Sequence, residues 1–281
     1  MHDKIDKLRE EMQRLKALEV RMFEAPDEQI SLTDPDARSM ATSGCGSGVV
    51  GYNVQAVVEI DHHLIVTHDV VQTGNDTSQL APMAQKAKEV LGVDELDVVA
   101  DRGYFSANQI KECADADITP TLPKPQTSSN RKKGMFVKAD FRYVADEDVY
   151  ICPADERLIW RYVTQEAGLV ISRYWADACG TCPLKVQCTT GPQRRISRWE
   201  HEDLVEDVQR RLDENPEAMR VRRETVEHPF GTIKMRMGAT HFLMTRLKNV
   251  KTEMALSVLA YNLTRVMNII GIKPLITAIQ A

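Results

Sequence analysis

The stretch from Arg220 to Met237 reads RVRRETVEHPFGTIKMRM, and it decides how we interpret the rest of the chain. On a helix, with about 100° between successive residues, one arc of roughly 80° carries the charged residues. That arc holds Arg220, Arg223, Glu227, Gly231 and Lys234, and the neighbouring arc holds Val226, Phe230, Ile233 and Met237. The pattern predicts one carboxylate on a cationic face, beside an apolar seam that docks on a core. Such an arrangement suits a metal-binding acid among phosphate contacts.

An ordinary solvated helix face is the competing interpretation, because Glu and Arg at i and i+4 commonly support exposed helices. Two residues argue against it. Pro229 costs about 3 kcal/mol or more in a helix interior, and Gly231 costs about 1 kcal/mol more. A kink or a close approach of the backbone is the simplest reason to keep both residues.

The composition is that of a soluble protein. The chain has 281 residues, of which 43% are hydrophobic and 27% charged, so it can bury a core in one large domain or two smaller ones. No apolar run approaches the ~18 residues of a spanning helix, and the N-terminus lacks the hydrophobic region of a signal peptide. We expect a cytoplasmic protein with no membrane partner.

The formal net charge of -5 argues mildly against a nucleic-acid partner. The distribution of charge changes this expectation. Between Arg220 and Lys251 there are eight Lys or Arg residues and two acids, Glu224 and Glu227, so the local charge is 8 - 2 = +6. That asymmetry makes a polyanion a plausible partner.

The N-terminal part of the chain predicts a helix followed by a β-hairpin. Residues 3–24 have an amphipathic pattern, which fits a helix packed on its own domain or one arm of a hairpin. Residues 43–48 have the composition of a linker loop. Residues 52–60 and 64–71 read as two strands of an antiparallel hairpin. Asp76 and Thr77 then offer caps for a helix that carries Leu80 to Leu91.

A second informative stretch, Asp97 to Tyr104, predicts a short buried strand that ends in the carboxylate of Asp101. Gly103 permits a tight turn after it. An Asp at the carboxyl end of a strand in an α/β sheet lies where ligand sites form. The alternative is an ordinary Asp–Gly turn with no function.

Further along, residues 118–123 predict a short edge strand, because prolines exclude a central position. The composition changes at Lys124, and residues 124–216 read as an insertion with short β segments from Phe141 to Tyr174. The apolar run from Leu256 to Ile270 predicts a buried closing helix.

Six cysteines in a chain without a secretion signal should be reduced or metal-bound. Four of them suit a closed, structural zinc site: Cys152, Cys179, Cys182 and Cys188. The alternative is a set of incidental buried thiols. Cys45 and Cys113 have no partners at ligand spacing and read as packing residues.

Several of these motifs together resemble the DDE transposases of bacterial insertion sequences. The resemblance begins at about Ser31 and rests on residues 33–38 (TDPDAR), 51–55 (GYNVQ), 100–106 (ADRGYFS), the four-cysteine segment, 223–234 (RETVEHPFGTIK) and 260–263 (AYNL). It covers the C-terminal half of such a transposase, including a cysteine-rich insertion. Where that family has a tyrosine three residues before Arg223, this chain has Arg220.

The resemblance implies a mixed α/β, RNase H-like core that cleaves and joins DNA with two Mg²⁺ or Mn²⁺ ions. Carried over, Asp101 is the second catalytic acid and Glu227 the third, both as metal ligands. Arg220, Arg223 and Lys234 would bind DNA, which comprises the transposon ends and the target. A homo-oligomer is also expected.

The first acid of the family has no counterpart that we recognise. It should end a first strand upstream of the hairpin, and no strand precedes residues 1–24. The nearby acids Asp34 and Asp36 lack a preceding strand, Asp61 lies in the hairpin turn, and Asp76 reads as a helix cap. We therefore expect a truncated copy that lacks the first strand and has little or no activity.

These observations give a domain division and three hypotheses. We expect an N-terminal helix (1–30), a first part of the core (31–123), the cysteine-rich insertion (124–216) and C-terminal core helices (217–281). The chain is a truncated transposase, a zinc-containing DNA-binding fragment without catalysis, or an inactive remnant.

Overall fold

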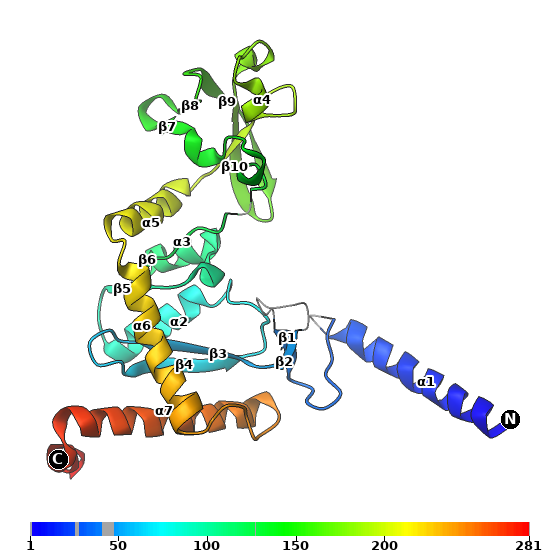
Figure 1. Ribbon diagram of the computed structural model, residues 1–281, viewed down its shortest axis with the longest axis vertical. Helices are drawn as coiled ribbons and strands as arrows, with labels where there is room; N and C mark the ends of the chain where they lie inside the picture. The colour runs from blue at the N-terminus through cyan, green and yellow to red at the C-terminus, as the bar shows by residue number, and fades with distance from the viewer. Residues whose placement is uncertain (1, 26–27, 41–47, 127, 281) are drawn as a thin grey trace. The chain divides into compact units, whose positions relative to one another are not determined.

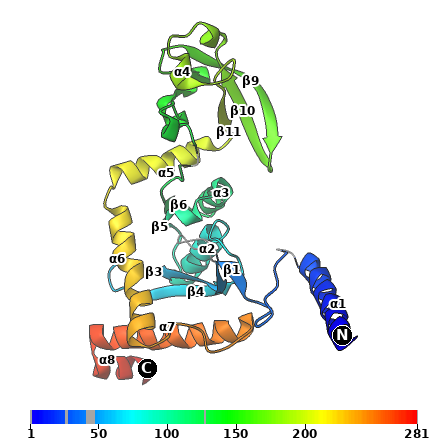
Figure 2. The ribbon, with the colours of Figure 1, turned by 45° about the vertical axis from the view of Figure 1, so that its right-hand side comes forward.

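The computed structural model describes residues 2–25, 28–40, 48–126 and 128–280. The chain divides into two compact units, whose elements are labelled in Figure 1 and seen from a second side in Figure 2. Unit 1 combines Met1–Pro123 with Arg211–Ala281, and unit 2 comprises Lys124–Arg210. The expectation that the middle segment is an insertion into a family core stays a prediction. The predicted linker at residues 43–48 lies outside the described residues except for Gly48.

The described part of unit 1 contains three two-stranded sheets. β1 (Arg38–Met40) pairs antiparallel with β2 (Val49–Gly51), β3 (Asn53–Val58) pairs antiparallel with β4 (Ile65–Val71), and β5 (Leu96–Val99) pairs parallel with β6 (Ile118–Thr121). The β3–β4 hairpin is the one that the alternating and β-branched residues predict. Parallel strands need a crossover connection, and α3 (Ala107–Asp115) supplies it between β5 and β6.

The hairpin turn between β3 and β4 is fixed by one side chain. The Glu59 carboxylate accepts hydrogen bonds from the backbone N–H groups of Asp61, His62 and Leu64 at 2.9, 2.8 and 3.0 Å. Burial raises the pKa of Glu59, but these three N–H groups outweigh that effect and hold the pKa below its usual value.

The remaining helices of unit 1 are α1 (His2–Glu24), α2 (Leu80–Leu91), the 3₁₀ turn η1 (Arg102–Tyr104), α6 (Ala218–Gly231), the π-helical segment η6 (Thr232–Arg236), α7 (Leu247–Ile270) and α8 (Ile272–Gln280). The predicted helix at the N-terminus is confirmed as α1. Its apolar stripe is not buried, since Leu8 and Met12 are 65% and 58% exposed. Of the two alternatives predicted for this helix, packing on its own domain is not seen in the described residues, and one arm of a hairpin stays a prediction.

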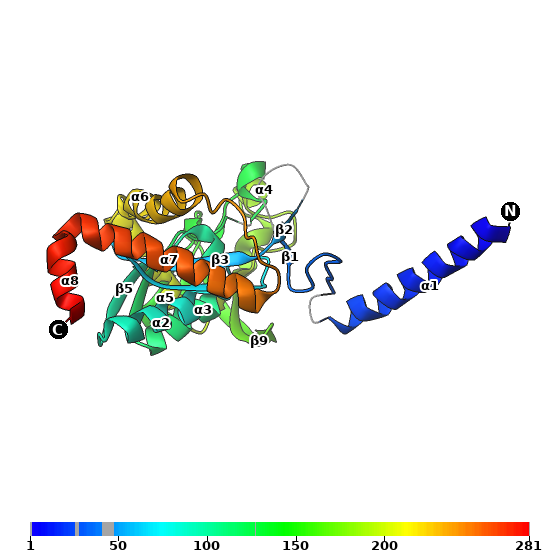
Figure 3. The ribbon, with the colours of Figure 1, turned by 90° about the horizontal axis from the view of Figure 1, so that it is seen from below.

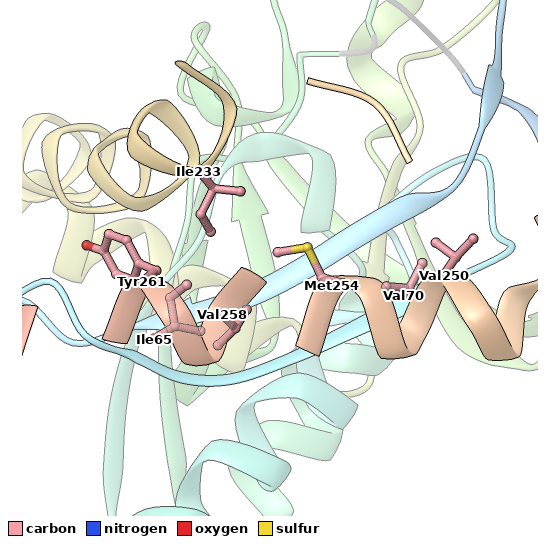
Figure 4. Close-up of a cluster of buried hydrophobic side chains, with 7 residues drawn as sticks. All are labelled: Ile65, Val70, Ile233, Val250, Met254, Val258 and Tyr261. Carbon is pink, nitrogen blue, oxygen red and sulfur yellow. The ribbon is translucent and has the colours of Figure 1, made fainter. Parts of the chain in front are cut away.

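One hydrophobic core cluster of unit 1 forms along α7 (Figure 4). Four α7 side chains at four- and three-residue spacing pack against β4 and η6: Val250, Met254, Val258 and Tyr261 against Ile65, Val70 and Ile233. We expected residues 256–270 to be buried, and this is only partly right, because Leu256 and Leu259 are 61% and 63% exposed. Residues 256–270 are apolar on all sides of α7, but the β3–β4 sheet covers only one face of this helix.

No single helix in the described ranges has both the length and the apolar content of a membrane span. Among the described helices, the pair α7 and α8 reaches that length and composition when taken together, and the two are bent by 113° at their junction.

α6 changes its winding after Pro229, which lies inside the helix and is fully buried. Proline has no N–H to donate to the carbonyl four residues earlier. Past Gly231 the chain continues as the wider π-helical η6, where the Met237 N–H donates to the Thr232 carbonyl at 3.1 Å. The expected close approach at Gly231 is absent among the described residues, because a Cβ there would meet no atom within 4 Å.

Unit 2 is built on a five-stranded antiparallel sheet in the order β11-β10-β9-β8-β7. Its strands are β7 (Arg142–Val144), β8 (Val149–Ile151), β9 (Arg157–Glu166), β10 (Leu169–Trp175) and β11 (Ile196–Trp199). Its helical segments are η2 (Arg131–Lys133), η3 (Lys138–Asp140), η4 (Ala145–Glu147), η5 (Asp177–Gly180), α4 (Lys185–Cys188) and the start of α5 (Glu202–Glu214). The predicted short β segments are confirmed. The fold class is mixed α/β, and its RNase H-like character stays a prediction.

Candidate functional site

Asp101 follows β5 directly, at the place where the sequence predicts a carboxylate. Its Oδ1 accepts the Gly103 N–H at 2.8 Å, which starts the η1 turn. Its Oδ2 accepts a hydrogen bond from Arg222 Nη2 of α6 at 3.0 Å. Both oxygens of Asp101 therefore have partners, and the charge of the carboxylate is paired with a guanidinium.

Asp76 lies next to Asp101, and sequence reasoning misassigned it. A Cβ on Gly103 would lie 3.0 Å from Asp101 Oδ1 and 3.4 Å from Asp76 Oδ2. We interpreted Asp76 as a helix cap, and this is wrong: α2 begins at Leu80, its N-cap is Gln79, and no side chain caps it. Asp76 Oδ1 instead accepts hydrogen bonds from the side-chain amides of Asn53 and Gln55, each at 2.7 Å.

Tyr104 completes this polar cluster. Its hydroxyl donates to Gln55 Oε1 at 2.5 Å. Burial, and then the negative charges of Asp76 and Asp101, raise the pKa of Tyr104 well above its usual value. Tyr104 therefore stays a neutral hydrogen-bond donor at physiological pH. The polar alternation of Asn53 and Gln55 in β3 is the one sequence signal that could have located this cluster.

The cationic face predicted for α6 is exposed as expected. Arg223, Glu227 and Lys234 are exposed, as is Arg220. Arg220 also pairs along the helix with Glu217 and Glu224 at 2.5 and 2.9 Å, so its charge is partly compensated. In the described part of the chain no acid lies within ion-pair distance of Arg223 or Lys234.

The apolar seam that we predicted is confirmed only in part: Ile233 is buried, and Met237 is 39% exposed. Ala218, Thr225 and Pro229 are buried, and Val226 and Phe230 are only half-buried. Arg222 belongs to the inward face of α6, because it reaches Asp101. Five residues further on, Glu227 lies about 140° around the helix from Arg222. In the described residues it is Arg222 of α6, and not Glu227, that has a hydrogen bond to Asp101.

Three further acids lie near the start of the chain. Two of them have hydrogen-bond partners, and the third is exposed. The Asp34 carboxylate accepts the Tyr52 hydroxyl at 2.7 Å and the Arg246 N–H at 3.1 Å. Asp36 accepts the Leu247 N–H at 2.9 Å, so both acids hold the N-terminus of α7. Asp61 lies exposed in the hairpin turn, as predicted. Among the described hydrogen bonds none connects these three acids with Asp101 or Asp76.

The four cysteines of the predicted zinc set all line one small cavity of unit 2. Arg194 lines it too, and Arg194 Nε is a buried donor with no acceptor among the described residues. Burial raises the pKa of the Cys188 thiol, Arg194 lowers it, and the other three cysteines raise it again. A thiolate would give this guanidinium its missing acceptor.

The four sulfur atoms, however, do not have the arrangement of a metal site. Within the described ranges no three His, Cys, Asp or Glu side chains form a group that could hold a metal ion. Of the two cysteines read as packing residues, Cys113 is buried in unit 1, and burial raises its pKa to about 12. Cys45 lies outside the described residues.

One comparison with known proteins gives a match. Residues 151–267 match the family model described as "Transposase DDE domain". No curated protein and no solved structure matches the chain significantly. The matched segment contains the four cysteines, Arg223, Glu227 and Lys234, and it excludes Asp101. The resemblance to DDE transposases is thereby confirmed for residues 151–267, the segment that is similar to the transposase DDE domain.

Proposed function

We propose that this chain is the C-terminal part of a DDE transposase and that, by itself, it binds DNA without cleaving it. The observation that carries the proposal is the exposed cationic face of α6, with Arg223 and Lys234, inside the segment that matches the transposase family. Phosphate oxygens are the natural partners of such a face. Arg220 contributes less, because two glutamates already pair with it.

Cleavage is the activity that the resemblance implies, and DDE transposase domains generally use divalent metal ions. The acids of this chain do not fit a site for two Mg²⁺ or Mn²⁺ ions as they stand. Asp101 is paired with Arg222, and Glu227 is exposed and has no contact with Asp101 among the described hydrogen bonds and ion pairs. Asp101 and Glu227 remain our candidates for the second and third acids of a complete site, for which the resemblance implies a first acid on another strand.

Structural zinc remains part of the proposal for unit 2. The donor chemistry fits, since the thiols of Cys152, Cys179, Cys182 and Cys188 line one cavity together with the unpartnered Arg194 Nε. Bound Zn²⁺ would cross-link the segments that carry these cysteines, with no open position for catalysis. Arg194 would donate a hydrogen bond to a thiolate.

The partners follow from the family. We propose transposon-end and target DNA as the nucleic acid, a homo-oligomer as the working assembly, and the cytoplasm as the location. The alternative, an inactive remnant, differs from this proposal in one measurable property, the salt-dependent retention of DNA.

Binding of a labelled DNA duplex to the full chain at increasing salt tests the proposal. We expect Arg223→Ala and Lys234→Ala each to weaken binding and to lower the slope of log K against log salt by about 1. Lys16→Ala, which removes an exposed cation of α1, is the matched control and should leave the slope unchanged. Equal effects of all three variants would contradict the assignment of this face.

A nicking assay tests the claim about catalysis. The purified chain with Mg²⁺ or Mn²⁺ and end-containing DNA should show no nicking above the level of Asp101→Ala. Clear nicking that Asp101→Ala abolishes would show that the acid set is complete.

A further inference from the structure

Residues 237–246 form a loop between η6 and α7, and we call it the η6–α7 loop. Figure 3 shows this loop between the end of the α6–η6 segment and the start of α7. Its apolar residue Leu243 is 83% exposed, and Met244 after it is 49% exposed. Scattered apolar side chains on a protein surface are ordinary and need no function. The exposure of Leu243 becomes informative through the way in which the loop is held.

The carboxylate of Glu253 on α7 holds the backbone of the loop at Leu243. Its two oxygens accept the Leu243 N–H at 2.9 and 3.1 Å, and Oε2 also accepts the Met244 N–H at 2.9 Å. A charged acceptor forms stronger hydrogen bonds with backbone N–H groups than a neutral acceptor does. The backbone at Leu243 is therefore attached to a helix.

The residues on either side of Leu243 are also anchored. Phe242 packs against the hydrophobic cluster along α7, with its ring 6.2 Å from the ring of Tyr52. Arg246 donates its N–H to the carboxylate of Asp34 at 3.1 Å. These attachments keep the backbone of the loop in place while the Leu243 side chain extends into solvent. Such preorganisation lowers the entropy that is lost when a partner binds.

The chain around the loop is cationic. Residues 234–251 contain no Asp or Glu and five Lys or Arg residues, all of them exposed: Lys234, Arg236, Arg246, Lys248 and Lys251. One of the five, Lys251, pairs with Asp69 at 2.8 Å. An apolar side chain among cations fits a partner with an anionic surface and an apolar interior. Duplex DNA has both properties, because its phosphates lie outside and its stacked bases lie inside.

An anionic lipid surface shares these two properties. DNA is favoured by continuity, since the loop begins shortly after Lys234 of the cationic α6 face. The loop also lies inside the segment that matches the transposase DDE domain. An anionic vesicle is therefore the competing partner in the test.

We propose that Leu243 inserts between neighbouring base pairs of DNA that the cationic face of α6 holds. Leu and Met side chains that enter the minor groove as wedges partly unstack a base step and kink the duplex by about 20–90°. Pyrimidine–purine steps such as TA and CA unstack most easily, so we expect the loop to favour them. The inference rests on the DNA binding proposed above and adds a deformation of the bound duplex to it.

Fluorescence of 2-aminopurine, which rises when this base loses its stacking neighbour, tests the inference. The full chain is added to a short duplex that carries 2-aminopurine in its TA steps, and retention of the same duplex is measured in parallel. We expect the fluorescence to rise on binding. Leu243→Ser should lose most of this rise, with an affinity weaker by about tenfold or less. Its salt slope should not change, because no phosphate contact is removed.

Two further variants separate insertion from other effects. Val186→Ser removes an apolar side chain that is 87% exposed on α4 of unit 2, and it should keep the full rise. Glu253→Gln weakens the hold on the loop and leaves Leu243 in place. The rise should then fall although the affinity for DNA does not, because the charge that is lost is negative. Circular dichroism verifies that all three variants fold.

Three results would overturn the proposal. They are retention of DNA without a rise in fluorescence, an equal rise with Leu243→Ser, and an equal loss with Val186→Ser. Binding to phosphatidylserine vesicles that Leu243→Ser abolishes, with no rise on DNA, would assign the loop to a lipid surface instead. A chain that retains no DNA would refute the proposed function as well, so retention and fluorescence distinguish the two failures.

Discussion

Asp101 and Arg222, which are 121 residues apart in the sequence, meet through a 3.0 Å contact between Oδ2 and Nη2. This ion pair joins the end of β5 to the inward face of α6. It also gives the candidate catalytic acid a cationic partner, at a position where the resemblance leads us to expect another acid and metal.

The first prediction concerns the strength of this pair. The Asp101 side chain is 41% exposed, so water screens the interaction, and Arg222→Ala should lower the free energy of unfolding by about 1 kcal/mol or less. Urea unfolding of Arg222→Ala, Asp101→Asn and the double variant measures the coupling. Arg223→Ala is the control, since Arg223 is exposed on another face of the same helix. A coupling energy of zero would contradict the pairing.

The second prediction concerns Asp34, which holds the start of α7. Burial raises the pKa of Asp34, but the hydrogen bonds from Tyr52 and from the backbone N–H groups of Asp36 and Arg246 together lower it below its usual value. A lowered pKa in the folded state means that the carboxylate stabilises the fold above the pKa of the unfolded chain, about 3.9. This contribution is lost as the pH falls through the lower, folded-state pKa.

Asp34→Asn should therefore cost about 1.5–3 kcal/mol at pH 7 and less at acidic pH, because the neutral side chain no longer forms charged hydrogen bonds. Urea midpoints across the range from pH 7 to pH 3 measure this difference. Asp61→Asn, at an exposed turn position, is the matched control. A cost that does not change with pH would show that the carboxylate charge is not involved.

The third prediction concerns Glu202, a buried acid of unit 2. Its Oε1 accepts the Lys138 ammonium at 2.7 Å, and its Oε2 accepts the Trp199 N–H at 3.2 Å. Burial raises the pKa of Glu202, and the charges of Lys138 and Lys124 outweigh burial and lower it. Glu202→Gln should cost about 2 kcal/mol in thermal or urea unfolding. Asp203→Asn, next in the chain and exposed, should change stability little, and an equal loss in both would count against the buried pair.

The fourth prediction concerns zinc. The purified chain should carry about one zinc ion, as a set of four thiolates would hold, and Cys179→Ser should lose it and destabilise unit 2. Cys113→Ser is the control, because Cys113 is buried in unit 1. Elemental analysis with a thiol titration measures both. A metal-free chain that is as stable as the zinc-treated chain would disprove the site.

The match to the transposase family bears on these predictions unequally. It covers the cysteines and Glu227 but not Asp101 or the Asp76 cluster. For Asp101 the assignment therefore depends on its place after β5 and on the quoted motif, and the nicking assay with Asp101→Ala is its direct test.

The sequence alone determined the features that depend on local pattern. The β3–β4 hairpin follows from alternation and β-branched residues. The exposed cationic face of α6 follows from the helical period. The change from α-helix to π-helix after Pro229 follows from the missing backbone N–H of proline. Each of these needs only neighbouring residues, so no long-range information is required.

Only the tertiary structure decided which residues meet across the chain. Asp76 lies beside Asp101 because Asn53 and Gln55 of β3 bind its carboxylate, whereas its sequence position suggested a cap. Arg222, not Glu227, faces Asp101 because α6 turns that side toward β5. Residues of both β3 and β5 line one cavity. The residue pattern of neither strand predicts this cavity, because it depends on how the two strands lie in space. Such contacts depend on how separate elements pack, and the periodicity of a single element does not encode them.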